Sequence, residues 1–135
     1  MLPKPVRSNV FRLPGFSELS ARDRRLIIRS SHAMAFVEGT MIIEQGHVDR
    51  RVLIVLDGVV ELFVDDATVG HAGRGTLLGA IVAGSARVSA TAVAVTNVRT
   101  VQMPSLLMRS LADRSSTVAY WLARDAEERR DHNTS

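Results

Sequence analysis

The side chains that most often carry catalysis are few in this chain, and their spacing matches no known catalytic or metal-binding motif. A metal site on a β-rich fold would need a His-x-His pair followed by a Glu and a further His, a pattern that His47 and His71 do not form. Glu38 and Glu44 flank a turn without a partner acid. The chain has no Cys, no Gly-x-Ser-x-Gly elbow and no P-loop. We therefore expect a protein that is not an enzyme and that holds no metal or cofactor.

Length and composition indicate one domain with a core, since 46% of the 135 residues are hydrophobic. No segment approaches the roughly 18 to 20 apolar residues of a membrane span, and the N-terminus has no apolar signal-peptide core. We expect a cytoplasmic protein without a membrane partner. The net charge is +3, and the densest basic stretches, 22–25 and 127–130, mix signs on expected helices. They are either solvated faces or a basic contact patch.

The first two thirds of the chain divide into an arm, a helix and a series of strands. Residues 1–15 hold three of the four prolines and are expected to form an extended arm. Ser20 with Asp23 three residues later is typical of a helix start. Asp57-Gly58 predicts one hairpin and Asp65-Asp66 a second hairpin tip. Short apolar runs punctuated by Gly and Asp predict strands at 34–37, 40–43, 52–56, 59–64, 68–69, 77–78, 88–95 and 98–103.

The last third returns to a helical pattern. Pro104 suits the first position of a helix, and a second helix is expected to begin between Asp113 and Ser116. Its Val118, Trp121 and Leu122 have i, i+3, i+4 spacing and form one apolar face, which is either core or a dimerisation or partner surface. Residues 131–135 should fray. We expect the β region at about 34–103, the C-terminal helices at about 104–130 and the whole domain at 16–130.

Several segments, taken in order and spacing, resemble one known family. They are Phe16–Ser20, Glu38–Thr40, Ile43–Gly46, Leu53–Leu62, Gly73–Gly79 and Ser89–Ala92. This arrangement resembles the cyclic-nucleotide-binding domain of catabolite-activator-type regulators, kinase regulatory subunits and nucleotide-gated channels. The resemblance implies a mainly β fold with flanking helices. That fold is a double-stranded β-helix, a jelly-roll-like β-roll, with one N-terminal helix and two C-terminal helices.

The resemblance also implies a phosphate-binding cassette, whose residues here are Gly79, Ala80, Ile81, Arg87, Val88 and Ser89. The family places a Glu directly after the Gly to accept the ribose 2′-OH, and this chain has Ala80. The family's Arg position falls on Val88, one residue from Arg87, and a one-residue slip turns a side chain to the opposite face. The loop is about two residues shorter than usual, which could re-aim Arg87. Arg87 is either an anion contact or a solvated loop residue, and Ser89 matches a hydroxyl position beside the phosphate.

Two functions follow from the resemblance. In the first, the domain binds a cyclic nucleotide such as cAMP or cGMP, or a related anion, and transmits binding through the C-terminal helix. In the second, the cassette has lost its ligand and the domain serves as a protein-interaction or dimerisation module. A homodimer or a protein partner is expected at the C-terminal helix in both. The chain ends about 20 residues past Asp113 in a charged tail, so DNA binding by this chain alone is not expected.

Overall fold

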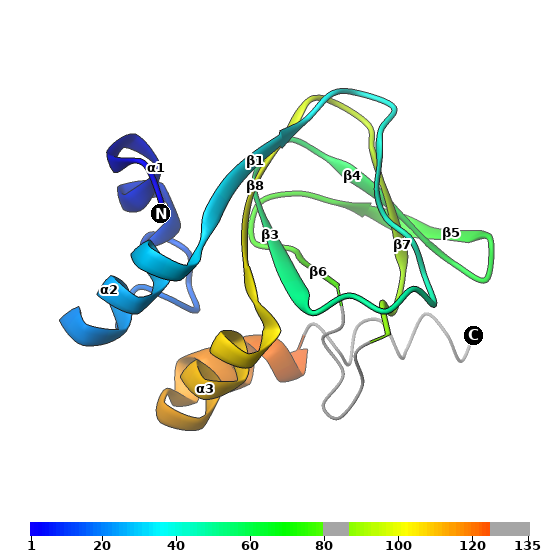
Figure 1. The fold of residues 1–135 in the computed structure, drawn as a ribbon. Coiled ribbons are helices and arrows are strands. Elements are labelled where there is room, and N and C mark those ends of the chain that lie inside the picture. Colours follow the sequence, from blue (N-terminus) through cyan, green and yellow to red (C-terminus); the bar gives the residue numbers. More distant parts are fainter. Residues whose placement is uncertain (80–86, 125–135) are drawn as a thin grey trace.

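The structure is a computed structural model that describes residues 1–79 and 87–124. The helices gather at one end of the molecule and the strands form a roll at the other (Figure 1). The helices are α1 (Lys4–Val10), α2 (Ala21–Ser30) and α3 (Ser105–Arg114). The strands are β1 (His32–Phe36), β2 (Met41–Ile43), β3 (Arg51–Asp57), β4 (Val60–Val64), β5 (Ala67–Ala72), β6 (Leu77–Gly79), β7 (Thr91–Ala94) and β8 (Val98–Pro104).

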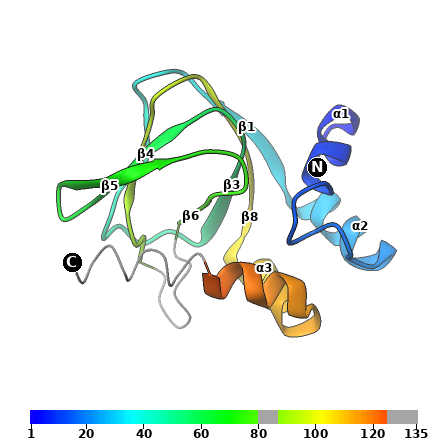
Figure 2. The same ribbon diagram turned by 180° about the vertical axis from the view of Figure 1, so that it is seen from behind.

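The strands pair as a jelly roll. One sheet has the order β1-β8-β3-β6 and the other β2-β7-β4-β5, all antiparallel. First therefore pairs with last, second with seventh, third with sixth and fourth with fifth, which is the double-stranded β-helix that the family resemblance implies. The view from behind shows the two sheets facing each other to form the roll (Figure 2).

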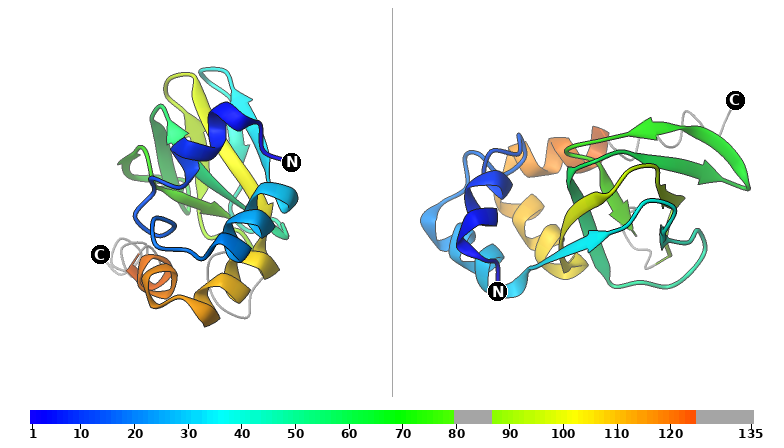
Figure 3. Two further views of the ribbon diagram at one scale, coloured as in Figure 1. Left: turned by 90° about the vertical axis from the view of Figure 1, so that its left-hand side faces the viewer. Right: turned by 90° about the horizontal axis from the view of Figure 1, so that it is seen from above.

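The β1-β8-β3-β6 sheet separates two hydrophobic cores. On β3, Val52 and Ile54 face the core shared with the helices, while Leu53 and Val55 face the interior of the roll. Both faces of this strand are buried, which explains its continuous apolar sequence in place of strict alternation. The view from above shows the helices packed against one side of this sheet and the second sheet on the other (Figure 3).

The predicted hairpin at Asp57-Gly58 is wrong. Strand β3 already has β6 and β8 on its two edges, so the chain crosses at this turn to the other sheet and enters β4. Gly58 has φ +96°, and a Cβ there would overlap the carbonyl of Asn97, so the crossing passes tightly over the β7–β8 connection. The second prediction is confirmed: Asp65 and Asp66, both with positive φ, form the two-residue tip between β4 and β5.

The expectation of an extended arm at residues 1–15 is wrong. Residues 4–10 form α1, with Pro5 in its first turn, where the missing N–H has no helical partner to lose. Leu2, Val10 and Leu13 are fully buried in the core that the helices share with β3 and β8. This apolar anchoring makes the segment part of the domain.

The predicted helix starts are confirmed. Ser20 is the N-cap of α2, and its Oγ accepts a hydrogen bond from the backbone N–H of Asp23 at 3.2 Å. The Asp23 carboxylate pairs with Arg114 of α3 at 2.7 Å and ties the two helices together. Pro104 is the N-cap of α3, and residues 116–124 form the next helical segment. None of the helices among the described residues is long and apolar enough to cross a membrane.

Candidate functional site

Gly79, the last residue of β6, marks the entrance to the predicted cassette. Its φ is +127°, and a Cβ at this position would lie 2.7 Å from the carbonyl oxygen of Arg51 on the neighbouring strand β3. The fold itself therefore demands glycine here, because of both the backbone conformation and the close approach. Ala80 and Ile81 of the predicted cassette lie outside the described residues.

Arg87 and Val88 lie on different sides of the backbone at the exit of the cassette. Val88 is only 3% exposed and belongs to the core inside the roll. Arg87 is exposed, and its guanidinium donates a hydrogen bond to the carbonyl of Gly46 at 2.8 Å. The backbone bridges Arg87 to Val48. The guanidinium therefore lies against the connection between β2 and β3, and an apolar side chain occupies the position that the family gives to Arg.

Ser89 joins the two ends of the cassette. Its backbone N–H and its Oγ each donate a hydrogen bond of 3.4 Å to the carbonyl of Gly79. The structure thus brings together two predicted site residues that are ten positions apart in sequence. The Ser89 hydroxyl therefore lies at the point where the chain leaves β6 for the cassette.

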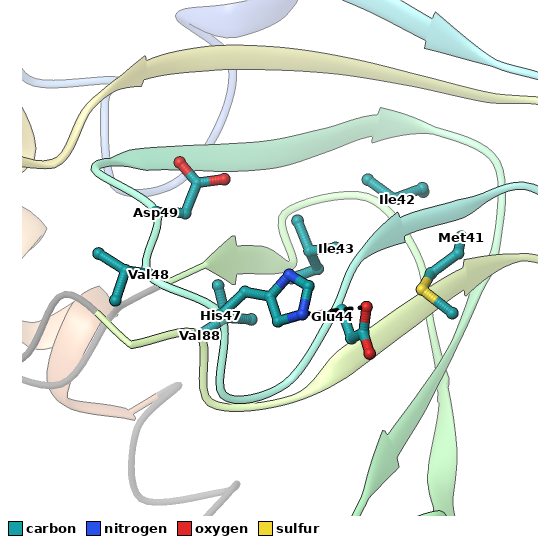
Figure 4. Close-up of a pocket in the computed structure, with 8 residues that line it drawn as sticks. All are labelled: Met41, Ile42, Ile43, Glu44, His47, Val48, Asp49 and Val88. Atoms are coloured by element: carbon teal, nitrogen blue, oxygen red, sulfur yellow. Dashed lines mark ion pairs between the residues drawn. The ribbon is translucent and has the colours of Figure 1, made fainter.

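A groove of about 240 Å³ opens beside the cassette exit. Its lining is apolar at Met41, Ile42, Ile43, Val48 and Val88, and polar at Glu44, His47 and Asp49. Figure 4 shows the His47 and Glu44 side chains next to each other, with Nε2 3.3 Å from the carboxylate oxygen. Among the described residues, Val88 belongs both to the lining of this groove and to the predicted cassette.

The acid at the far end of the groove is held by a neighbouring arginine. Arg51 contacts both carboxylate oxygens of Asp49, at 3.1 and 3.0 Å, and also donates to the Gln102 side chain at 2.6 Å. This hydrogen bonding lowers the pKa of Asp49 and raises the pKa of Arg51. The pair is therefore a fixed, internally neutralised group, and it leaves little net negative charge facing an anionic ligand.

The apolar face of the C-terminal helix packs inside its own chain. Val118 is fully buried, and Trp121 and Leu122 are half-buried against the same core. The Trp121 ring meets Phe16 edge-on at 5.2 Å, and its Nε1 donates to the carbonyl of Gly75 at 3.2 Å. Of the two sequence interpretations, the structure places these residues in the core. Among the described residues of this helix, the large hydrophobic side chain that is exposed is Tyr120, at 65%.

The lining of the groove was missed by the sequence analysis. Met41 and Val48 are exposed hydrophobic residues, and Asp49 with Arg51 forms a close ion pair across a loop. Strand β2, the loop after it and the first residue of β3 carry these residues, so no spacing rule identifies them. The usable signal was the Asp-x-Arg spacing of 49 and 51, which allows a bidentate pair at a strand start.

Comparison with known sequences now decides the family. Residues 33–115, more than half of the chain, match the family described as cyclic nucleotide-binding domain. The chain belongs to this family. A cAMP-dependent protein kinase regulatory subunit from Candida albicans is 34% identical over 85 residues, which are 62% of this chain and 18% of that protein. This cyclic nucleotide-binding domain therefore corresponds to less than a fifth of its curated relative.

Solved structures agree with the fold. The regulatory subunit of a cAMP-independent protein kinase A from Trypanosoma brucei has a TM-score of 0.76 at 21% identity, over 92% of this chain and 45% of that one. The regulatory domain of Toxoplasma gondii PKA, crystallised with cAMP, has a TM-score of 0.75 at 17% identity, over 92% and 49%. Likeness at this identity concerns the fold alone. The same fold thus occurs in a protein described as cAMP-independent and in one that holds cAMP.

Proposed function

We propose that this domain is a non-catalytic receptor that binds a cyclic nucleotide, such as cAMP or cGMP, or a related anionic ligand at its cassette. Its C-terminal helix would transmit the bound state. Family membership supports the ligand class. The observation that carries the proposal is the contact between Ser89 and Gly79, which closes the cassette, with Arg87 two residues before Ser89.

The chemistry of a cyclic phosphate matches this set of groups. A buried monoanion needs backbone N–H donors and a guanidinium. Arg87 already donates to the Gly46 carbonyl at the groove's edge. A guanidinium has five donors, so the contact with this carbonyl does not by itself exclude a phosphate contact. In this proposal the phosphate lies beside Gly79 and Ser89, on the Arg87 side of the β2–β3 connection.

Ala80 sets the expected affinity. It provides no side-chain acceptor for the ribose hydroxyl, where the family has a Glu. A hydrogen bond to a charged partner contributes about 1.5 to 3 kcal/mol, which is roughly one to two orders of magnitude in Kd. We therefore expect weaker binding than in a domain with the Glu, and Ala80→Glu should tighten it by about 10- to 100-fold.

The decisive experiment is calorimetric titration with cAMP, cGMP and a cyclic dinucleotide. The control for Arg87→Ala is Arg99→Ala, which removes another exposed arginine, one that lies on β8 in the β1-β8-β3-β6 sheet. We expect saturable binding in the wild type and in Arg99→Ala, and at least a tenfold loss in Arg87→Ala. Equal affinity in both variants would remove Arg87 from the site. No heat with any nucleotide would refute the receptor and favour a protein-interaction module.

Transmission through the C-terminal helix defines where a reader would bind. Val118, Trp121 and Leu122 face the core of the chain. A protein that reads the helix would therefore contact the opposite face, which carries Tyr120.

A further inference from the structure

One tight turn, residues 73–76 between β5 and β6, holds both helical ends of the chain. Arg74 hydrogen-bonds to the side-chain oxygen of Asn9, to its carbonyl at 2.8 Å and to the carbonyl of Leu56 at 3.1 Å. The carbonyl of the next residue, Gly75, accepts the indole N–H of Trp121 at 3.2 Å. The N-terminal helix and the C-terminal helix are thus fastened to adjacent residues of the same turn.

The Trp121 ring packs against Gly15, a residue far away in sequence, in a place where a Cβ would not fit. A Cβ on Gly15 would overlap Cε3 of the Trp121 ring. Gly15 has no positive φ, so its backbone does not require glycine; the indole does. Phe16 then contacts the ring edge-on, with the centroids 5.2 Å apart. Such an edge-to-face pair is one of the preferred aromatic arrangements.

From this turn a very short strand leads to the cassette. The Gly75 N–H donates to the Val55 carbonyl at 2.8 Å, and the Val55 N–H donates to Thr76 at 3.0 Å. Strand β6 follows with Leu77 in the core of the helices, Leu78 in the interior of the roll and Gly79 at the cassette entrance. Three extended residues span about 10 Å. Because both leucines are fully buried, the strand cannot shift without disturbing both cores.

We propose that Trp121 is a positioning residue for the cassette. By holding the Gly75 carbonyl, its indole sets the turn, and through β6 it sets the backbone of Gly79 that faces Ser89. The position of Gly79 at the cassette entrance and the position of the Trp121 ring are then coupled, and the coupling is reciprocal. The claim that Trp121 positions Gly79 does not depend on a ligand. The claim that this affects ligand binding rests on the proposed receptor function.

The test without ligand displaces the Trp121 indole and measures amide hydrogen exchange in the turn and in β6. Trp121 is the only tryptophan of the chain, so its fluorescence reports the seat directly. We expect Gly15→Ala to shift the emission to the red and to raise amide hydrogen exchange in peptides covering 76–79 by at least tenfold, with β4 and β5 unchanged. The matched control is Gly73→Ala, since Gly73 also lacks a positive φ and its Cβ would meet only the Gly58 carbonyl at 3.4 Å. It should leave the emission unchanged.

A second variant separates the effect of the Trp121 hydrogen bond from that of its ring packing. It also provides a test if Gly15→Ala does not fold. Trp121→Phe keeps an aromatic ring on Phe16 and removes the N–H donor to Gly75. We expect exchange at 76–79 to rise by a smaller factor than in Gly15→Ala. Red-shifted emission in Gly15→Ala with unchanged exchange at 76–79, or no change in exchange in Trp121→Phe, would overturn the coupling.

The ligand arm uses cAMP as its probe. We expect cAMP to alter the Trp121 emission of the wild type and to bind Gly15→Ala at least fivefold more weakly. Equal affinity in both proteins would refute the link to the ligand and leave the receptor proposal intact. If calorimetry finds no cAMP binding to either protein, the cAMP receptor proposal fails, and hydrogen exchange alone decides whether Trp121 positions the cassette.

Discussion

The need for glycine at position 79 can be measured as a loss of stability, without any ligand. The residue pairs with Val52 across β6 and β3 and has φ +127°. A Cβ would lie 2.7 Å from the Arg51 carbonyl oxygen and 3.5 Å from the Val52 Cα, both of which are backbone atoms. Gly79→Ala therefore imposes strain at the residue itself and a clash that only a backbone shift can relieve.

Both contributions can be given a size. A non-glycine residue in this region of backbone space costs about 1 to 3 kcal/mol. Forcing an extra methyl group into a packed region costs about another 1 to 3 kcal/mol. We expect Gly79→Ala to lower the free energy of unfolding by about 3 kcal/mol, a large part of the stability of a single domain.

Gly70→Ala is the matched control. Gly70 lies in β5 with φ +137°, and no atom of the described residues comes within 4 Å of its Cβ position. It should therefore show the strain alone, about 1 to 2 kcal/mol. Urea unfolding followed by circular dichroism measures both variants. Equal losses would refute the role of the Arg51 carbonyl contact, and no loss in Gly79→Ala would refute the whole argument.

Three further predictions concern polar groups of the fold, each measured by urea unfolding. Ser31 is buried, and its Oγ has no hydrogen-bond partner among the described residues; Ser31→Ala should raise the free energy of unfolding by about 1 kcal/mol, and a loss would contradict this. Asp23→Ala breaks the pair with Arg114 and should lower it by about 1 kcal/mol, an effect expected to shrink in high salt. The Arg51 contact holds the pKa of Asp49 below its usual value of 3.8, so its stabilisation is present at pH 7 and lost as the pH falls through the folded-state pKa. Asp49→Asn should then be less stable than the wild type at pH 7, and the difference should close as the pH falls through the folded-state pKa; a difference that shows no pH dependence would count against this ion pair.

Much of the local structure was predictable because its causes are local. Ser20 caps α2 through a bond to Asp23, three residues away. Asp65 and Asp66 tolerate the positive φ of a two-residue hairpin tip. The order of these elements, matched to a family, was enough to predict the jelly roll.

The candidate site was only partly predictable, since its geometry depends on contacts between distant strands. Ser89 reaches Gly79 as the family pattern suggested. The sequence left open whether a shorter loop re-aims Arg87 inward. In the structure Val88 takes the interior and Arg87 contacts Gly46, because pairing with Val48 sets the orientation of this stretch.

The sequence by itself determined the order of the strands and the starts of α2 and α3, because these depend on periodicity, capping and spacing along the chain. Tertiary structure alone decided that Gly58 crosses between sheets and that residues 4–10 form a helix anchored in the core. It also decided that Trp121 is seated against Gly15 and Gly75. In each of these cases the deciding atoms belong to residues far away in sequence. Whether β3 has an unpaired edge for β4, and whether the Trp121 ring can pack against a residue without a Cβ, depends on contacts that form only when the chain has folded.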